Sequence, residues 1–341
     1  MTRTAHVDAD RYDFHPYFTE FSKYVNGDLT IVNIEMPIDV FDDNRNLSSY
    51  PLFNAPYEIL DAVRDMGFNL FINANNHTFD KGWDGFVATR ANFDRAGVVH
   101  TGTAETEDEE RFYLREINGI TFGVIAYTDS LNGLDYLVPQ DKRGFAVNVF
   151  SHSLEGAKRI AGDIARCREA GAEFVVVSLH WGVEYVNNPS ETQKQIARML
   201  VENGADIIMG NHSHCVQPIE EHTAEDGRTG LIIYSLGNFF ADQNDMQVPI
   251  RKTQYAMLVS VTVERAESGK PEIINWHYIP TFVYRYADNS SATGVYYALL
   301  SSADFLDNEG FFVSASDFAR NREAYEHVVD IVGEDHLYAP S

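Results

Sequence analysis

Cysteine is nearly absent from the sequence: Cys167 and Cys215 are the only two among 341 residues. Two cysteines allow at most one bridge, which excludes the disulfide framework of small secreted domains. Cys167 lies in a helical pattern and is typical of a free cysteine in a core. Cys215 follows His214 directly, so a thiolate ligand there is an alternative, because zinc accepts sulfur as well as imidazole.

Basic residues and long apolar runs are also scarce. Lysine and arginine number 26 against 51 acidic residues, a formal charge of −25, which disfavours nucleic acid or an anionic membrane surface as a direct partner. No apolar run reaches the roughly 18 residues of a membrane span. The N-terminus does not show the basic, apolar and small-residue order of a secretory signal. An apolar content of 44% suits a chain with a sizeable buried core.

The sequence predicts an α/β fold with additional antiparallel strands. Helical periods separate apolar runs that resemble buried strands, as in βαβ units with a largely parallel sheet. The expected helices cover residues 16–25, 57–66, 82–96, 152–170 and 191–202. An Asn118-Gly119 hairpin turn and alternating stretches at 255–263 and 271–286 indicate antiparallel strands. We expect one domain over residues 1–288 and a helical, acidic extension over 289–341.

Side chains of the kind that bind metals follow four of the predicted strands. They are Glu35, the Asn75-Asn76-His77 cluster, His180, and the pair His212 and His214. In open α/β sheets, ligands gather outside the carboxyl ends of the strands, so these placements predict one shared site. Imidazole nitrogen combined with carboxylate or amide oxygen favours zinc, manganese or iron over calcium or magnesium.

Each cluster taken alone has an ordinary structural explanation. Glu35 is typical of a solvated turn residue, Asn75-Asn76 of a turn or helix N-cap, and His180 of a hydrogen-bonded neighbour of Trp181. Their coincidence at four strand ends favours a metal site instead. A carboxylate such as Glu35 can bridge two ions that hold the attacking and leaving oxygens of a phosphoester, and His77 would then serve as general acid or stabilise the transition state.

Five short motifs occur in one order along residues 12–287. They are Asn33-Ile-Glu35-Met-Pro37-Ile38, Asn75-Asn76-His77 with Asp80 and Gly82, His180-Trp181-Gly182-Val-Glu184-Tyr185, Gly210-Asn-His212-Ser-His214 with Gln217-Pro218, and Tyr234-Ser-Leu-Gly237-Asn238-Phe239. This set resembles the capsule-biosynthesis CapA family, also called poly-γ-glutamate synthesis proteins. Its fold is similar to that of calcineurin-like metallophosphoesterases, which implies a layered α/β/β/α sandwich of mixed sheets.

The resemblance implies a role for each matched residue. Glu35 takes the place of a bridging aspartate, Asn76 that of an amide ligand, and His77 that of the catalytic histidine. Of the remaining histidines, His180 and His212 complete the ligand set of one metal ion, and His214 is a ligand of the other ion. The positions that match the pocket wall are Asn75, Glu184, Gly237 and Asn238. For residues 234–240, a buried strand and turn is the alternative.

The resemblance also implies function, cofactor and placement. We expect a metal-dependent hydrolase of a phosphoester or polymer linkage, with two divalent ions of manganese, iron or zinc in the complete site. The alternatives are a non-catalytic polymer-binding or export partner in capsule synthesis, and a general metallophosphodiesterase or nucleotidase. Expected partners are an anionic capsule polymer or phosphoester and other capsule-synthesis proteins, and the expected placement is extracellular or membrane-anchored.

One element of the family pattern is not found. The pattern begins with a strand that ends in Gly-Asp, with a histidine shortly after, and residues 1–11 form no such strand. His6, Asp8 and Asp10 occur there without an apolar run to position them. Either the natural start lies upstream, or the chain has lost its first metal and holds one ion. The unpaired edges left by a lost interior strand favour the first explanation.

Overall fold

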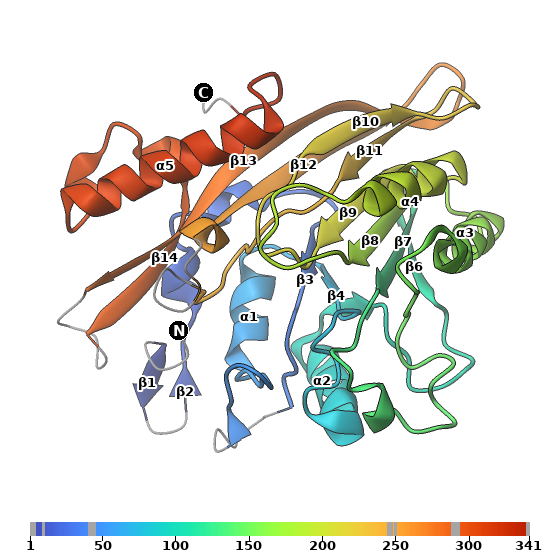
Figure 1. Ribbon diagram of the computed structural model, residues 1–341, viewed down its shortest axis with the longest axis horizontal. Coiled ribbons are helices and arrows are strands. Elements are labelled where there is room, and N and C mark those ends of the chain that lie inside the picture. The colour runs from blue at the N-terminus through green and yellow to red at the C-terminus, as the bar shows by residue number, and fades with distance from the viewer. Residues whose placement is uncertain are drawn as a thin grey trace.

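The computed structural model describes residues 5–8, 11–39, 46–243, 248, 251–287 and 294–338. Within these residues the chain forms a six-stranded sheet, two three-stranded sheets and a two-stranded ribbon (Figure 1). The ribbon consists of β1 (His6–Asp8) and β2 (Arg11–Tyr12). Asp10 and the side chains of His6 and Asp8 lie outside the described residues.

The six-stranded sheet carries the predicted parallel core. Its order is β10 (Ile219–Thr223), β11 (Thr229–Ile233), β9 (Ile207–Asn211), β8 (Phe174–His180), β7 (Ile120–Thr128) and β6 (Phe112–Ile117). The four central strands are parallel, and β10 and β6 pair antiparallel at the edges. The hairpin turn between β6 and β7 is confirmed, with positive φ at both Asn118 and Gly119, as a two-residue turn requires.

Helices α3 (Leu154–Glu169) and α4 (Glu191–Glu202) cover one face of this sheet, as Figure 1 shows. Ile160 and Leu200 pack there against Val175 and Val177 of β8. Ser190 starts α4 with a reciprocal capping box, which satisfies two donors that a helix N-terminus leaves open. Cys167 is fully buried in α3, so its predicted core position is confirmed.

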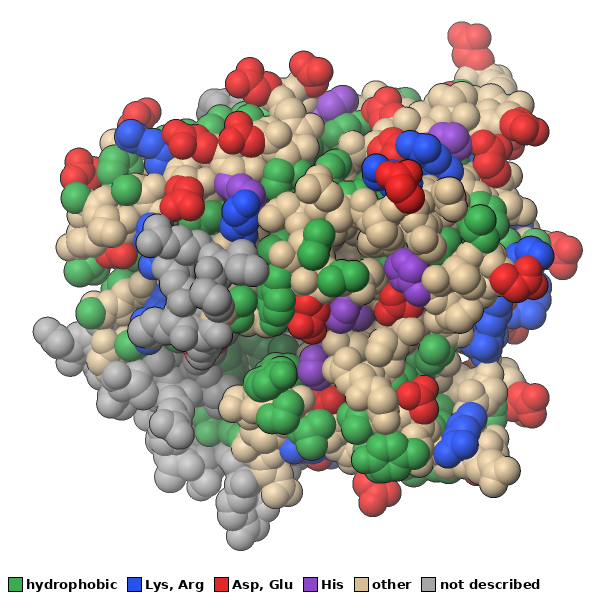
Figure 2. All heavy atoms as spheres, viewed as in Figure 1, with side chains coloured by type: hydrophobic (Ala, Val, Ile, Leu, Met, Phe, Trp, Pro, Cys, Tyr) green, Lys and Arg blue, Asp and Glu red, His purple; other side chains and the backbone are tan. Residues whose placement is uncertain are grey.

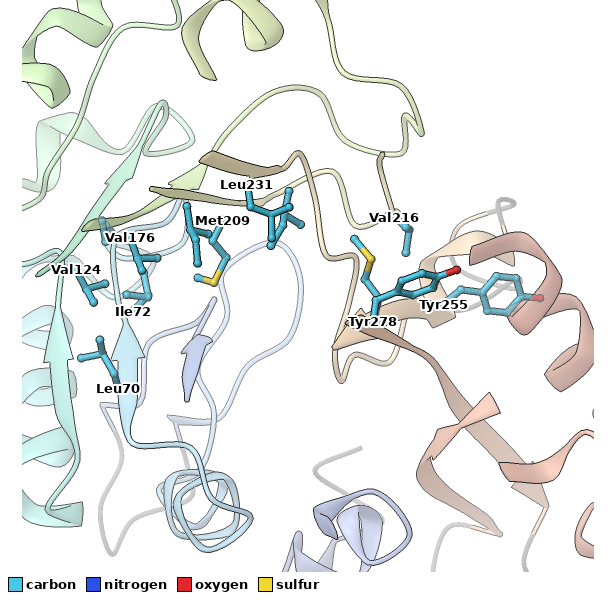
Figure 3. Packing of buried hydrophobic residues seen from close by; sticks show 14 of the residues in the cluster. Leu70, Ile72, Val124, Val176, Met209, Val216, Leu231, Tyr255 and Tyr278 are labelled. Atoms are coloured by element: carbon cyan, nitrogen blue, oxygen red, sulfur yellow. The ribbon is translucent and has the colours of Figure 1, made fainter. Parts of the chain in front are cut away.

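The second sheet faces the first across an apolar core. It contains β3 (Ile31–Asn33), β4 (Leu70–Ile72) and β5 (Val99–Thr101), all parallel. Leu70 and Ile72 belong to the same cluster as Val124 and Val176 of the six-stranded sheet (Figure 3). The other face of β4 is covered by α1 (Glu58–Asp65) and α2 (Gly82–Ala96), through Leu60 and Phe93 against Phe71. The α/β/β/α layering is therefore confirmed.

The third sheet is antiparallel. Its strands are β12 (Tyr255–Arg265), β13 (Pro271–Ala287) and β14 (Val295–Ser301). Helix α5 (Ala315–Val332) lies along β13 (Figure 1). The prediction of a helical extension did not include β14, whose apolar residues pair with β13. The predicted boundary at residue 288 lies outside the described residues, and the two-part division stays a prediction.

One predicted helix is wrong. Residues 16–25 form two short 3-10 helices, η1 (His15–Phe18) and η2 (Ser22–Tyr24). Tyr17, Phe18 and Phe21 are buried, whereas Thr19 and Lys23 are exposed, so the amphipathic pattern is present although the backbone does not form one α-helix. The other 3-10 helices are η4 (Asp135–Leu137), η5 (Arg251–Gln254), η6 (Ser302–Phe305) and η7 (Glu309–Phe311). Among the described residues, no helix combines the length and apolar character needed to cross a membrane.

Candidate metal centre

Glu35, His180 and His212 come together where strands of two facing sheets end. Glu35 follows β3 of one sheet, while His180 ends β8 and His212 follows the neighbouring β9 of the other. One ligand atom from each residue lies within 4.8 Å of those of the other two. Nδ1 of His212 is 3.0 Å from Nε2 of His180, which is 3.4 Å from Oε1 of Glu35. These three residues are called the ligand group below.

His214 lies beside the ligand group rather than within it. Its Nε2 is 3.8 Å from Oε1 of Glu35 and 3.9 Å from Oε1 of Glu184. Its Nδ1 donates to Oδ1 of Asn238 at 2.9 Å, and the Asn238 amide is fixed because its Nδ2 donates to the Thr253 carbonyl at 3.0 Å. A histidine whose second nitrogen is held in this way presents Nε2 as a metal donor.

The loop that carries both histidines has a strained backbone. His212 and His214 have φ values of 95° and 56°, a region in which a non-glycine residue costs about 1–3 kcal/mol. Gly210, just before them, packs so closely that a side chain there would overlap the carbonyl of Tyr234. Tertiary contacts therefore impose this loop conformation, and they place both imidazoles at the end of β9.

The asparagines after β4 have two different environments. Asn75 is fully buried, donates to the Ile34 carbonyl at 2.8 Å and accepts from the His77 amide at 3.1 Å. It therefore ties β4 to β3, whereas the sequence predicted a position in the pocket wall. Asn76 donates to Oδ1 of Asn132 at 3.3 Å, and its own Oδ1 is buried with no hydrogen-bond partner among the described residues.

The buried donors fit a divalent transition metal. Oε1 of Glu35, like Oδ1 of Asn76, has no hydrogen-bond partner among the described residues, an arrangement that costs about 1–3 kcal/mol per group unless a cation compensates it. Burial, with the neighbouring histidines, holds the pKa of His180 well below its usual value, and burial also lowers the pKa of His212. Both imidazoles are thus neutral near pH 7, which is the form that binds metals.

His77 forms a buried pair with Asp80 at the edge of the site. Nδ1 of His77 is 2.7 Å from Oδ2 of Asp80, and the Phe53 amide donates to the same oxygen at 2.8 Å. Burial by itself lowers the pKa of His77, but the hydrogen bond and charge of Asp80, together with Glu35 and Glu184, outweigh it and raise the pKa. Sequence reasoning assigned Asp80 no role, although the His-x-x-Asp spacing was a signal.

A cavity of about 1590 Å³ adjoins the site, and Asn75, Asn76 and His180 are not among the residues that line it. The predicted site residues on its wall are Glu35, His77, Glu184, His212, His214, Gly237 and Asn238. On the face seen in Figure 2, histidine and acidic side chains gather near a central hollow. Cys215 is fully buried, and burial raises the pKa of its thiol to about 11. It is not part of the ligand group found among the described residues, so the thiolate alternative gains no support.

Comparisons with known proteins agree with the sequence motifs. Residues 1–243 match the family model described as bacterial capsule synthesis protein PGA_cap. The chain is 28% identical over 257 residues to the PGA biosynthesis protein CapA of Bacillus subtilis, covering 74% of this chain and 60% of that protein. It is 30% identical over 250 residues to the capsule biosynthesis protein CapA of Bacillus anthracis, covering 71% and 58%. The chain thus spans about three fifths of the length of these relatives.

Solved structures give only distant likenesses. A hypothetical protein from Thermus thermophilus has a TM-score of 0.42 at 15% identity, covering 74% of this chain and 88% of that one. A putative 5′-nucleotidase from Staphylococcus aureus has a TM-score of 0.40 at 14% identity, covering 79% and 44%. Both likenesses are too weak to carry a functional argument.

Proposed function

We propose a function for this chain, which belongs to the PGA_cap family of bacterial capsule synthesis proteins. It is a metal-dependent hydrolase that cleaves a phosphoester or polymer linkage. The observation that carries the proposal is the ligand group. A carboxylate oxygen of Glu35 is buried without a hydrogen-bond partner among the described residues, within ligand distance of two imidazoles held neutral by burial.

The ligand group and its neighbours would hold the ion or ions. Glu35, His180 and His212 would hold one ion, and His214 and Asn76 would supply donors for a second. The mixed nitrogen and oxygen donors favour zinc, manganese or iron. A divalent ion, when bound, activates water for attack and offsets the negative charge of the substrate.

His77 is the proposed general acid. Asp80 holds Nδ1 and raises the pKa of the imidazole, which favours the protonated form, and Nε2 would donate its proton to the oxygen of the leaving group. Asp80 acts through His77 and is a positioning residue. The pair sits on the cavity wall, so the leaving group would occupy the space in front of His77.

The proposed substrate is anionic. The names of the two Bacillus relatives place them in capsule or PGA biosynthesis, so we propose an anionic capsule polymer or its phosphoester precursor, other capsule-synthesis proteins as partners, and a place at the cell envelope. With a formal charge of −25, the chain repels such a polymer except where bound cations reverse the local field.

Metal content and turnover, measured on the same variants, test the proposal. We expect bound zinc or manganese and hydrolysis of bis-p-nitrophenyl phosphate in the parent protein. His212→Ala should lose both, and His77→Gln should retain metal and lose turnover. His222→Ala is the matched control, since His222 lies on β10 and pairs with Glu202 at 2.8 Å.

Less than one ion per chain with no turnover would contradict the hydrolase. If polymer binding survived in that case, the protein would be the non-catalytic partner instead.

A further inference from the structure

Asn75 presents a hydrogen-bond donor to the neighbouring strand β3. Its Oδ1 accepts from the His77 amide at 3.1 Å, and its Nδ2 donates to the Ile34 carbonyl at 2.8 Å. Exchanging the oxygen and the nitrogen of this buried amide would set an oxygen against a carbonyl and a nitrogen against an N–H group. The two backbone groups therefore fix its orientation. The same Nδ2 lies 3.3 Å from Oδ1 of Asn33, to which it donates.

Asn33, the last residue of β3, connects this fixed amide to His180. Because Oδ1 of Asn33 accepts from Asn75, its Nδ2 is the atom that faces Nδ1 of His180, at 3.3 Å. An amide nitrogen donates and does not accept, so Nδ1 of His180 is the acceptor and carries no proton. Burial keeps this imidazole neutral, and a neutral imidazole holds one proton, which must then be on Nε2.

The distances within the ligand group agree with a proton on Nε2 of His180. This nitrogen lies 3.0 Å from Nδ1 of His212, which is the usual length of a hydrogen bond. Two ring nitrogens at this distance need a hydrogen between them, because two facing lone pairs would repel each other. Nε2 of His180 supplies that hydrogen, and Nδ1 of His212 accepts it.

This tautomer is the opposite of the one that a metal ligand needs. A histidine that binds a metal uses the lone pair of one ring nitrogen and usually donates the N–H of the other to an oxygen. For His180 this requires its proton on Nδ1 and a turn of the Asn33 amide, so that Oδ1 becomes the acceptor. Nδ2 of Asn33 would then face Nδ2 of Asn75. Two donors in contact leave a hydrogen bond unmade, which opposes the turn.

We propose that Asn33 is a positioning residue that lowers the metal affinity of the ligand group. Held by Asn75, it keeps the proton of His180 on Nε2, the nitrogen that faces Glu35 and His212. An ion can use that nitrogen only after the Asn33 amide has turned. The proposal rests on the ligand group as a metal site, which is part of the proposed function, but not on hydrolysis there.

The position of the proton can be observed directly in the full 341-residue protein. Long-range nitrogen–proton NMR on metal-free protein with labelled histidine, at pH 8, distinguishes protonated from unprotonated ring nitrogens. His180→Gln identifies the His180 signals by their loss. We expect an unprotonated Nδ1 in the parent protein. In Asn33→Asp one carboxylate can accept from Asn75 and from Nδ1 of His180 together, so Nδ1 should be protonated.

Zinc affinity, measured by calorimetry, is the second readout. Asn33→Asp should bind zinc about 10–100-fold more tightly than the parent, because it supplies the carboxylate partner of a ligating histidine. Asn69→Asp is the matched control. Asn69 lies just before β4, where its Oδ1 accepts from the Thr30 amide at 3.0 Å, and its replacement should change neither the zinc affinity nor the proton of His180. Circular dichroism checks the folding of each variant.

Two results would overturn the proposal. One is a proton on Nδ1 of His180 in the metal-free parent, a result that decides the matter even if Asn33→Asp does not fold. The other is equal zinc affinity of the parent and Asn33→Asp. Neither readout uses turnover. A protein that gives both expected results but hydrolyses nothing would contradict the proposed hydrolase and would still support the role of Asn33.

Discussion

Asp80→Asn should remove the charge that does most to raise the pKa of His77. The Asp80 carboxylate is 1% exposed and the His77 side chain 7%, at 2.7 Å, so solvent screens the pair very little. With the charge gone, burial lowers the pKa of His77 and only the more distant Glu35 and Glu184 still raise it, so we expect the pKa of His77 to fall. Asparagine keeps the shape and an acceptor, so the loss is that of a charge-assisted hydrogen bond, about 1.5–3 kcal/mol.

This loss should depend on pH in one direction. A histidine whose pKa is raised by folding contributes stability that is fully present below its unfolded pKa of about 6.5 and disappears as pH rises through the folded value. Asp80→Asn should therefore lower the free energy of unfolding at pH 5.5 and have little effect at pH 9.

Urea unfolding of chelator-treated protein at both pH values measures the stability, and the imidazole Cε1 proton resonance reports the pKa of His77. Asp141→Asn is the control, because that carboxylate is 76% exposed. An equal loss at both pH values, or an unchanged pKa, would refute the reasoning.

Three further outcomes follow from the same structure. Asn238→Ala releases Nδ1 of His214, so zinc affinity measured by calorimetry should fall about 10–100-fold; unchanged affinity would exclude His214 as a ligand. Gly210→Ala forces a contact with the Tyr234 carbonyl and should cost about 1–3 kcal/mol in urea unfolding, whereas parental stability would show that the backbone can yield. Burial raises the pKa of the Cys167 and Cys215 thiols to about 11, so both should resist Ellman's reagent at pH 8 until the protein unfolds; rapid labelling of the native protein would contradict this.

Local patterns identified most elements but not their partners. The helices expected over residues 82–96 and 191–202 both have those limits in the structure. The strands before Glu35 and His180 were also found, yet nothing in their sequences shows that they belong to different sheets. Strand β10 was not predicted, because its residues, Ile-Glu-Glu-His-Thr, do not alternate between apolar and polar.

The residues of the candidate site could be predicted from the sequence, but the geometry of their side chains could not. The motifs selected Glu35, His180 and His212, which the structure brings together, and their role as ligands stays a proposal. The tie from Asn75 to Ile34 and the pairing of His77 with Asp80 depend on side-chain orientation, which sequence spacing does not determine.

The ligand group draws its donors from both halves of the sandwich, Glu35 from one sheet and two histidines from the other. A cation bound there would cross-link the two sheets. Its removal would lower the stability of the contact between them and would also abolish any metal-dependent reaction. Ion occupancy and melting temperature should therefore rise together with free metal concentration. A simple thermal titration would then rank cations for this protein before any substrate is known.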